Sequence, residues 1–117
     1  MREINFYESD SGDQPVAEFL TSLPPDVRAK VVWTLELLRT LPFVPVKYWK
    51  KLQGSEGLWE VRIEYGGNIY RLLACTAKGN RVVLLHGFQK KSQKTPLQEM
   101  EIAVQRKRRY FLRHGYL

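Results

Sequence analysis

The stretch that decides the fold is LWEVRIEYGGNIYRLLACTA (residues 58–77). In its first half, the apolar side chains of Trp59, Val61 and Ile63 alternate with charged ones. This alternation predicts a strand with one packed face and one charged face. Gly66-Gly67 then predicts a two-residue hairpin turn, because glycine readily adopts the positive φ angles that such turns require. An antiparallel hairpin therefore forms the centre of the predicted structure, with strands over 58–65 and 69–76.

Further elements flank this hairpin and place the chain in the α+β class. Alternating patterns predict strands over 2–8 and 81–89, which gives an antiparallel sheet of about four strands in all. Helically spaced apolar residues predict a helical hairpin over 15–23 and 24–41. A last, basic helix is expected over 95–113. Its predicted N-cap is Thr95, its first helical residue is Pro96, and its apolar side holds Leu97, Met100, Val104 and Phe111.

The segment between the helical hairpin and the central strands, residues 42–57, reads as irregular. It contains Lys47-Tyr48-Trp49-Lys50-Lys51. Basic residues interleaved with aromatic ones bind nucleic acid through phosphate contacts and base stacking. The alternative is that Tyr48 and Trp49 cap the core beneath a loop. The sequence leaves both interpretations open.

Length and composition favour one domain over residues 1–117, since 13.7 kDa with 44% hydrophobic residues is enough for one core. A single cysteine, Cys75, excludes an internal disulfide and suits a reducing, cytoplasmic compartment. No apolar run is long enough to span a membrane, and the first residues do not read as an export signal.

The net charge of +7 is unevenly distributed. Residues 1–80 hold ten basic and ten acidic side chains, whereas residues 81–117 hold nine basic side chains and only two acidic ones. A basic last third is the electrostatic pattern expected for a protein with a polyanionic partner. The alternative is a solvated basic helix that only keeps the protein soluble.

Counting outward from the two predicted turns places three basic groups in a row. A Gly66-Gly67 turn sets Arg62 opposite Arg71, and a turn centred on Lys78-Gly79 sets Arg71 opposite His86. Glu60 and Lys90 extend the row on the same face. Like charges placed opposite each other destabilise a sheet. Because two arginines can together hold an anion such as a phosphate, the row favours an anion-binding role.

Two alternatives remain for this row. Glu60 and Glu64 can neutralise the two arginines as ordinary surface ion pairs, and His86 can be a satisfied, partly buried histidine. Other chemistries have less support, because the sequence lacks zinc-ligand spacing and a phosphate-binding glycine loop, so no metal or cofactor is expected. Cys75 lies in an apolar strand and is expected to be structural.

The chain resembles the RelE/ParE toxin superfamily of toxin–antitoxin modules, and most closely its phage-derived, HigB-like branch. The likeness spans nearly the whole chain. It is carried by residues 57–62 (GLWEVR), 70–73 (YRLL), 85–91 (LHGFQKK) and 94–96 (KTP), with Glu99 and Ala103. The resemblance implies a microbial-RNase-like α+β fold that cleaves mRNA in the ribosomal A site without a metal. It also implies an antitoxin partner of the helix-turn-helix type.

The resemblance places catalytic groups at Arg62, Arg71 and Lys90 or Lys91, and an acid, Glu60, where some relatives have lysine. In the expected mechanism, Arg62 and Arg71 stabilise charge on the phosphate oxygens, while Lys90 and Lys91 hold the flanking RNA backbone. His86 or Glu60 is the general base, with His86 preferred because it titrates near neutrality. The expected RNA-binding residues are Lys47, Lys50, Lys51, Lys91, Lys94, Arg106, Arg108 and Arg109.

Three further alternatives concern function. The basic helix can dock the antitoxin through Val104 and Phe111 instead of binding ribosomal RNA. A ParE-like protein shares this architecture but inhibits gyrase by binding it. An inactive module that binds nucleic acid or protein would use the same basic surface for affinity alone.

Overall fold

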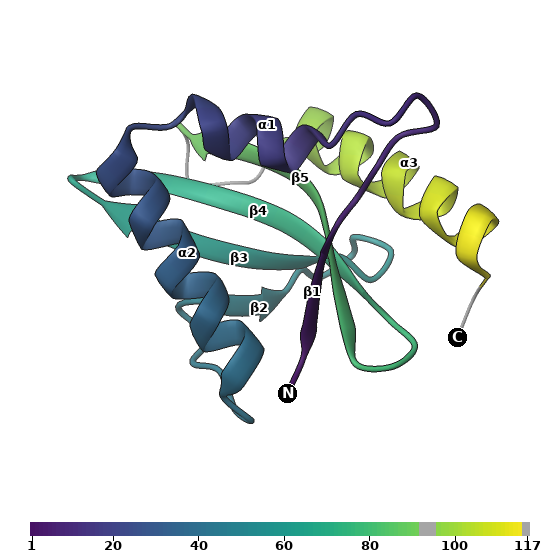
Figure 1. The fold of residues 1–117 in the computed structure, drawn as a ribbon, viewed down its shortest axis with the longest axis horizontal. Coiled ribbons are helices and arrows are strands. Elements are labelled where there is room, and N and C mark those ends of the chain that lie inside the picture. The colour runs from purple at the N-terminus through teal and green to yellow at the C-terminus, as the bar shows by residue number, and fades with distance from the viewer. Residues whose placement is uncertain (92–95, 116–117) are drawn as a thin grey trace.

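The computed structural model describes residues 1–91 and 96–115. These residues form an α+β fold in which helices cover both faces of one sheet (Figure 1). In chain order the elements are β1 (Glu3–Phe6), α1 (Pro15–Ser22), α2 (Pro25–Thr40), β2 (Trp49–Lys51), β3 (Trp59–Tyr65), β4 (Asn68–Ala77), β5 (Arg81–Lys90) and α3 (Leu97–His114).

The sheet is mixed and has five strands in the order β1-β5-β4-β3-β2. The predicted sheet of about four antiparallel strands is therefore wrong in two respects. First, β2 lies in the segment that was interpreted as irregular, because three residues are too few to show an alternating pattern. Second, β1 pairs with β5 in parallel. No hairpin turn connects these two strands, so local sequence does not set their relative direction.

The central hairpin has the predicted register. Gly66 and Gly67 form the turn with φ angles of 59° and 81°. Tyr65 pairs with Asn68, and Arg62 lies directly opposite Arg71. The first two members of the predicted basic row are therefore confirmed as neighbours.

The hairpin between β4 and β5 departs from the predicted register twice. Ala77 pairs with Arg81, so three residues (78–80) connect the strands instead of two. A β-bulge follows between Leu73 and Ala74, where β5 contributes one extra residue. Each shift alone would move side chains to the other face of the sheet. Beyond the bulge the two shifts together move the pairing by two residues, so that part of β5, which includes His86, keeps the predicted face.

As a result, His86 lies opposite Leu73, and Arg71 lies opposite Phe88. The predicted pairing of Arg71 with His86 is wrong, although both side chains belong to the same face. Phe88 takes the place expected for the histidine, and it is buried.

The two faces of the sheet carry separate cores. The core beneath α1 and α2 includes Val16, Val31, Leu38, Val61, Ile63, Leu72 and Leu84. The core beneath α3 includes Leu58, Leu73, Cys75, Val83, Leu85, Ala103, Tyr110 and Phe111. The face that was expected to stay open is thus covered by α3 over part of its length. Only the end that carries the charged residues of β3 lies outside this second core.

The start of α3 differs from the prediction by one residue. In α3 the first helical residue is Leu97, one position after the prediction, and Pro96 is the N-cap. The predicted cap, Thr95, lies outside the described residues. Leu97 is 76% exposed, so it does not belong to the packed side as expected, whereas Met100 and Val104 do pack against the core.

Within residues 1–91 and 96–115, no helix has the length and apolar character needed to cross a bilayer.

Candidate functional site

Five charged residues from four neighbouring strands share one face of the sheet, and we call them the strand cluster: Lys50, Glu60, Arg62, Arg71 and Lys90. The strand pairing fixes their arrangement. Lys50 on β2 lies opposite Glu60 on β3, and Arg62 lies opposite Arg71 on β4. Lys90, at the end of β5, lies two residues beyond the partner of Arg71. Four cations and one carboxylate are therefore held on a rigid sheet.

Within the strand cluster, Arg71 and Glu60 form a buried ion pair. The Arg71 guanidinium donates to a Glu60 carboxylate oxygen at 2.5 Å, and the two residues are only 8% and 4% exposed. A charged pair with so little water around it is held firmly, since each charge depends on the other for its solvation. Glu60 therefore fixes the orientation of Arg71.

Arg62 is more accessible and also has an acidic neighbour. Its Nη2 lies 3.8 Å from Glu64 Oε1, and both side chains are substantially exposed. The interpretation in which Glu60 and Glu64 neutralise the two arginines thus describes the observed partners. However, only the Arg62 pair is an ordinary surface pair, and such pairs contribute little to stability. With Lys50 and Lys90 added, the surface remains positive.

Lys90 has an altered acidity because of its neighbours. Burial lowers the pKa of Lys90, and the positive charges of Arg71, Arg62 and Lys50 lower it further, while Glu60 opposes the shift. A lowered pKa raises the fraction of neutral amine at a given pH. Lys90 is therefore a titratable group inside the cluster, the role that the sequence assigned to His86.

His86 is engaged elsewhere, between β5 and α3. Its Nε2 lies 3.2 Å from Glu99 Oε1, and its Nδ1 lies 3.2 Å from Arg106 Nη1. Arg106 can only donate and a carboxylate can only accept, so both contacts fit a neutral ring protonated on Nε2. Burial lowers the pKa of His86, which also favours the neutral form. The interpretation of His86 as a satisfied, partly buried histidine matches this geometry.

The arginines of α3, expected at RNA, contact the rest of the protein. Arg106 is half-buried and donates to the backbone oxygen of Leu85 at 2.8 Å. Arg108 donates to both carboxylate oxygens of Glu56, at 2.8 and 3.0 Å. These contacts attach α3 to β5 and to the loop before β3.

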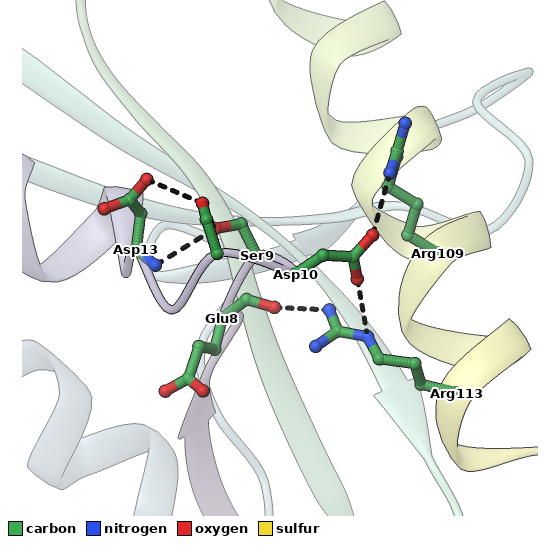
Figure 2. A network of polar contacts seen from close by, with 7 residues as sticks. Glu8, Ser9, Asp10, Asp13, Arg109 and Arg113 are labelled. Carbon is green, nitrogen blue, oxygen red and sulfur yellow. Dashed lines mark hydrogen bonds and ion pairs between the residues drawn. The ribbon is translucent and has the colours of Figure 1, made fainter.

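A second set of contacts attaches the end of α3 to the loop that follows β1. Figure 2 shows Asp10 between two arginines of α3, with Arg109 at 3.3 Å and Arg113 at 3.5 Å. Arg113 also donates to the backbone oxygen of Glu8. In the described part of the chain, Arg108 and Arg109 thus each have a carboxylate partner. Their charge is partly compensated.

The lysines expected to bind RNA lie differently. Lys47, Lys50, Lys51 and Lys91 are exposed, and among residues 1–91 and 96–115 none of them forms an ion pair. Lys94 lies outside the described residues. Of the neighbouring aromatic residues, Trp49 is buried and stacks on Trp59 with ring centres 4.7 Å apart. The core interpretation therefore holds for Trp49.

A groove beside the strand cluster was missed in the sequence. It is lined by Lys30, Lys47, Tyr48, Arg62 and Glu64. Nothing in the sequence marks Lys30 as a binding residue, because a lysine is common at any solvent-facing position of a helix. Only the packing of α2 against β3 brings it to the charged strands.

The remaining candidates carry no chemistry of this kind. Cys75 is buried, and burial raises the pKa of its thiol to about 12, as expected for a structural cysteine. In the part of the chain that the structure describes, no three His, Cys, Asp or Glu side chains gather in a way that could hold a metal ion.

Comparison with known proteins assigns the sequence to a family. The model of the family described as "Phage derived protein Gp49-like (DUF891)" matches residues 18–108, from within α1 to within α3, and includes the whole strand cluster. No curated protein matches the chain. Because the family model covers well over half of the sequence, this chain belongs to the phage-derived Gp49-like family.

Proposed function

We propose that this chain is an mRNA endoribonuclease with a RelE/HigB-like fold, active on translating ribosomes and using the strand cluster as its catalytic surface. Membership in the Gp49-like family suggests a toxin of a toxin–antitoxin module. The observation that carries the nuclease proposal is the pairing of Arg62 with Arg71 on adjacent strands, with Lys90 beside them. Two arginines directly opposite each other are costly in a sheet and useful to a phosphate.

The proposed reaction is an RNA transesterification. The ribose 2′-oxygen loses its proton and forms a bond to the adjacent phosphorus, while the bond from phosphorus to the 5′-oxygen breaks. The products are a 2′,3′-cyclic phosphate and a 5′-hydroxyl, whose oxygen gains a proton. Negative charge grows on the non-bridging oxygens during this step, and fixed cations aimed at those oxygens lower the barrier. Arg62 and Arg71 have this role, and Glu60 positions Arg71 without contacting the RNA.

The proton of the 2′-hydroxyl needs an acceptor inside the cluster. Lys90 fits this role because its lowered pKa increases the supply of neutral amine. Glu60 is a weaker candidate, since its carboxylate is buried against Arg71. His86, the acceptor preferred from sequence, lies beneath α3 with both ring nitrogens engaged. In this proposal it positions α3.

The exposed lysines supply affinity. Lys50 of the strand cluster and the exposed Lys47, Lys51 and Lys91 bind the phosphates of mRNA or ribosomal RNA, a contribution that weakens with salt. The proposed protein partner is a cognate antitoxin of the helix-turn-helix type.

Primer extension on cellular transcripts after induced expression tests the proposal. The informative variant is Arg62→Gln, because Arg62 is partly exposed and its removal leaves the buried pair intact. Lys78→Gln, in the exposed turn after β4, is the charge-matched control. We expect new transcript ends with the wild type and the control. With Arg62→Gln, cleavage should fall by about 10²- to 10³-fold.

Two results would contradict the nuclease proposal. Growth arrest with DNA damage and intact mRNA would indicate a ParE-like gyrase inhibitor. If expression causes no growth arrest and no mRNA loss, the protein is a module that only binds.

A further inference from the structure

The groove beside the strand cluster has the chemistry of a single-stranded RNA site. It is lined by Lys30, Lys47, Tyr48, Arg62 and Glu64, so three cations face one carboxylate. We infer that this groove, together with Trp33, which contacts its lining residues Lys30 and Tyr48, binds a nucleotide that flanks the scissile phosphate. The inference extends the proposed nuclease function, because it names where the substrate continues beyond the strand cluster.

The first argument is the combination of cations with an exposed ring, Trp33, and a partly buried one, Tyr48. The Nζ of Lys30 lies 4.2 Å from the centre of the Trp33 ring, and the Nζ of Lys47 lies 4.9 Å from the centre of the Tyr48 ring. The rings of Trp33 and Tyr48 pack edge to face, with their centres 5.8 Å apart. A π-face beside a positive charge holds a base and its phosphate together, which is how proteins bind single strands without reading sequence.

The second argument is the exposure of Trp33. Trp49 and Trp59 stack on each other in the first core, whereas Trp33 lies on the outer side of α2 and is 46% exposed. Tryptophan is the largest apolar side chain and is usually well buried in a folded protein. A half-exposed tryptophan beside Lys30 therefore offers apolar surface that a nucleotide base can cover.

The third argument is continuity with the strand cluster. Arg62 belongs to both sites, and its backbone N–H donates to the backbone oxygen of Tyr48 at 3.0 Å. A strand of RNA with its phosphate at Arg62 and Arg71 therefore has its next nucleotide beside Tyr48 and Lys47. An acidic peptide would satisfy the lysines but would leave the aromatic ring without a stacking partner.

The test measures the affinity of the full-length protein for a short single-stranded RNA with 2′-O-methyl riboses, using fluorescence anisotropy. Methylation removes the attacking hydroxyl, so binding is measured without cleavage. Trp33→Ala should weaken binding by about 5- to 100-fold, the loss typical of one stacked base. Trp33→Phe, which keeps an aromatic face, should restore most of the affinity. Lys30→Gln should also weaken binding and reduce the salt dependence by about 0.7 in the log–log slope.

Matched controls separate the groove from the general surface. Val32→Ala changes the exposed neighbour of Trp33 on α2, and Lys78→Gln removes a lysine from the turn after β4. Both should bind RNA as the wild type does. Unchanged affinity in Trp33→Ala would overturn the inference. So would a loss of antitoxin binding with RNA affinity unchanged, which would make the groove a protein-docking surface.

The same measurements distinguish this inference from the nuclease proposal. If the groove variants lose RNA affinity but the wild type cleaves no mRNA, the groove stands as an RNA site and the nuclease proposal fails. If the wild type cleaves mRNA and the groove variants bind and cleave equally well, the nuclease proposal stands and the inference about the groove fails.

Discussion

Breaking the Arg71–Glu60 pair should destabilise the whole protein. The perturbation is Glu60→Gln, which removes one charge and keeps the size of the side chain. Because both partners are less than one tenth exposed, the remaining Arg71 charge would be left buried without its carboxylate. Loss of one partner from a buried pair costs about 3–5 kcal/mol. In a chain of 117 residues, this corresponds to a fall in Tm of about 10–20 °C.

Thermal and urea unfolding followed by circular dichroism measure this loss. Glu64→Gln is the matched control, because it removes the partner of Arg62 from an exposed pair. The control should change the free energy of unfolding by less than about 1 kcal/mol. The double variant Glu60→Leu with Arg71→Met removes both charges, so it should regain most of the lost stability. It should nevertheless remain inactive, because Arg71 is needed for catalysis in the proposed reaction.

Equal and small losses in Glu60→Gln and Glu64→Gln would refute the reasoning, because they would mean that water reaches the Arg71 pair as freely as the Arg62 pair. A double variant with wild-type cleavage would show that Arg71 has a structural role only.

Three further predictions concern other parts of the fold. Gly87→Ala should lower the free energy of unfolding, measured in urea, by about 1–3 kcal/mol, because a Cβ there would lie 2.5 Å from the Phe19 ring. Adding Phe19→Leu to this variant should recover part of the lost stability. An unchanged free energy of unfolding in Gly87→Ala would show that α1 shifts freely. Burial lowers the pKa of His86 from 6.5, so the unfolded chain binds more protons just below that pH. The wild type should therefore lose stability as the pH falls below about 6.5, and His86→Gln should lose less; parallel curves would contradict the assignment. Cys75, with a thiol pKa of about 12, should react with iodoacetamide only when urea unfolds the chain, and rapid labelling of folded protein would show that the site opens.

Local sequence determined the central hairpin well. The Gly66-Gly67 turn leaves one register that puts Trp59, Val61 and Ile63 on the packed face. Strand alternation and turn chemistry agree there, so the pairing of Arg62 with Arg71 was predictable. The starts of α1 and α2 were predictable as well, because prolines mark their first turns.

The position of His86 shows where this kind of reasoning fails. A three-residue connection and a β-bulge each move the pairing by one residue, and neither has a clear signal in Lys78-Gly79-Asn80 or in Leu84-Leu85. The two shifts cancel in side-chain parity, so the predicted face was right while the predicted partner was wrong. β5 also packs against α3 and β1, and these contacts between distant segments are not visible in its local sequence.

The sequence also does not show which charged side chains form ion pairs. A sequence shows that α3 is basic, but it does not show that Arg108 reaches Glu56 or that Arg109 reaches Asp10. These partners are distant in sequence and meet only after folding. Part of the basic charge of the last third is therefore compensated by acidic partners within the fold, while the exposed Lys47, Lys50, Lys51 and Lys91 remain available to an anion.

The measurement that tests the central claim most directly is the chemistry of the RNA ends after cleavage by the purified protein on programmed ribosomes. Attack by the 2′-oxygen, assisted by Arg62, Arg71 and Lys90, leaves a 2′,3′-cyclic phosphate on one fragment and a 5′-hydroxyl on the other. The account predicts these ends for the wild type and the same ends at a much lower rate for Lys90→Met. Fragments that end in a 3′-hydroxyl and a 5′-phosphate would contradict it.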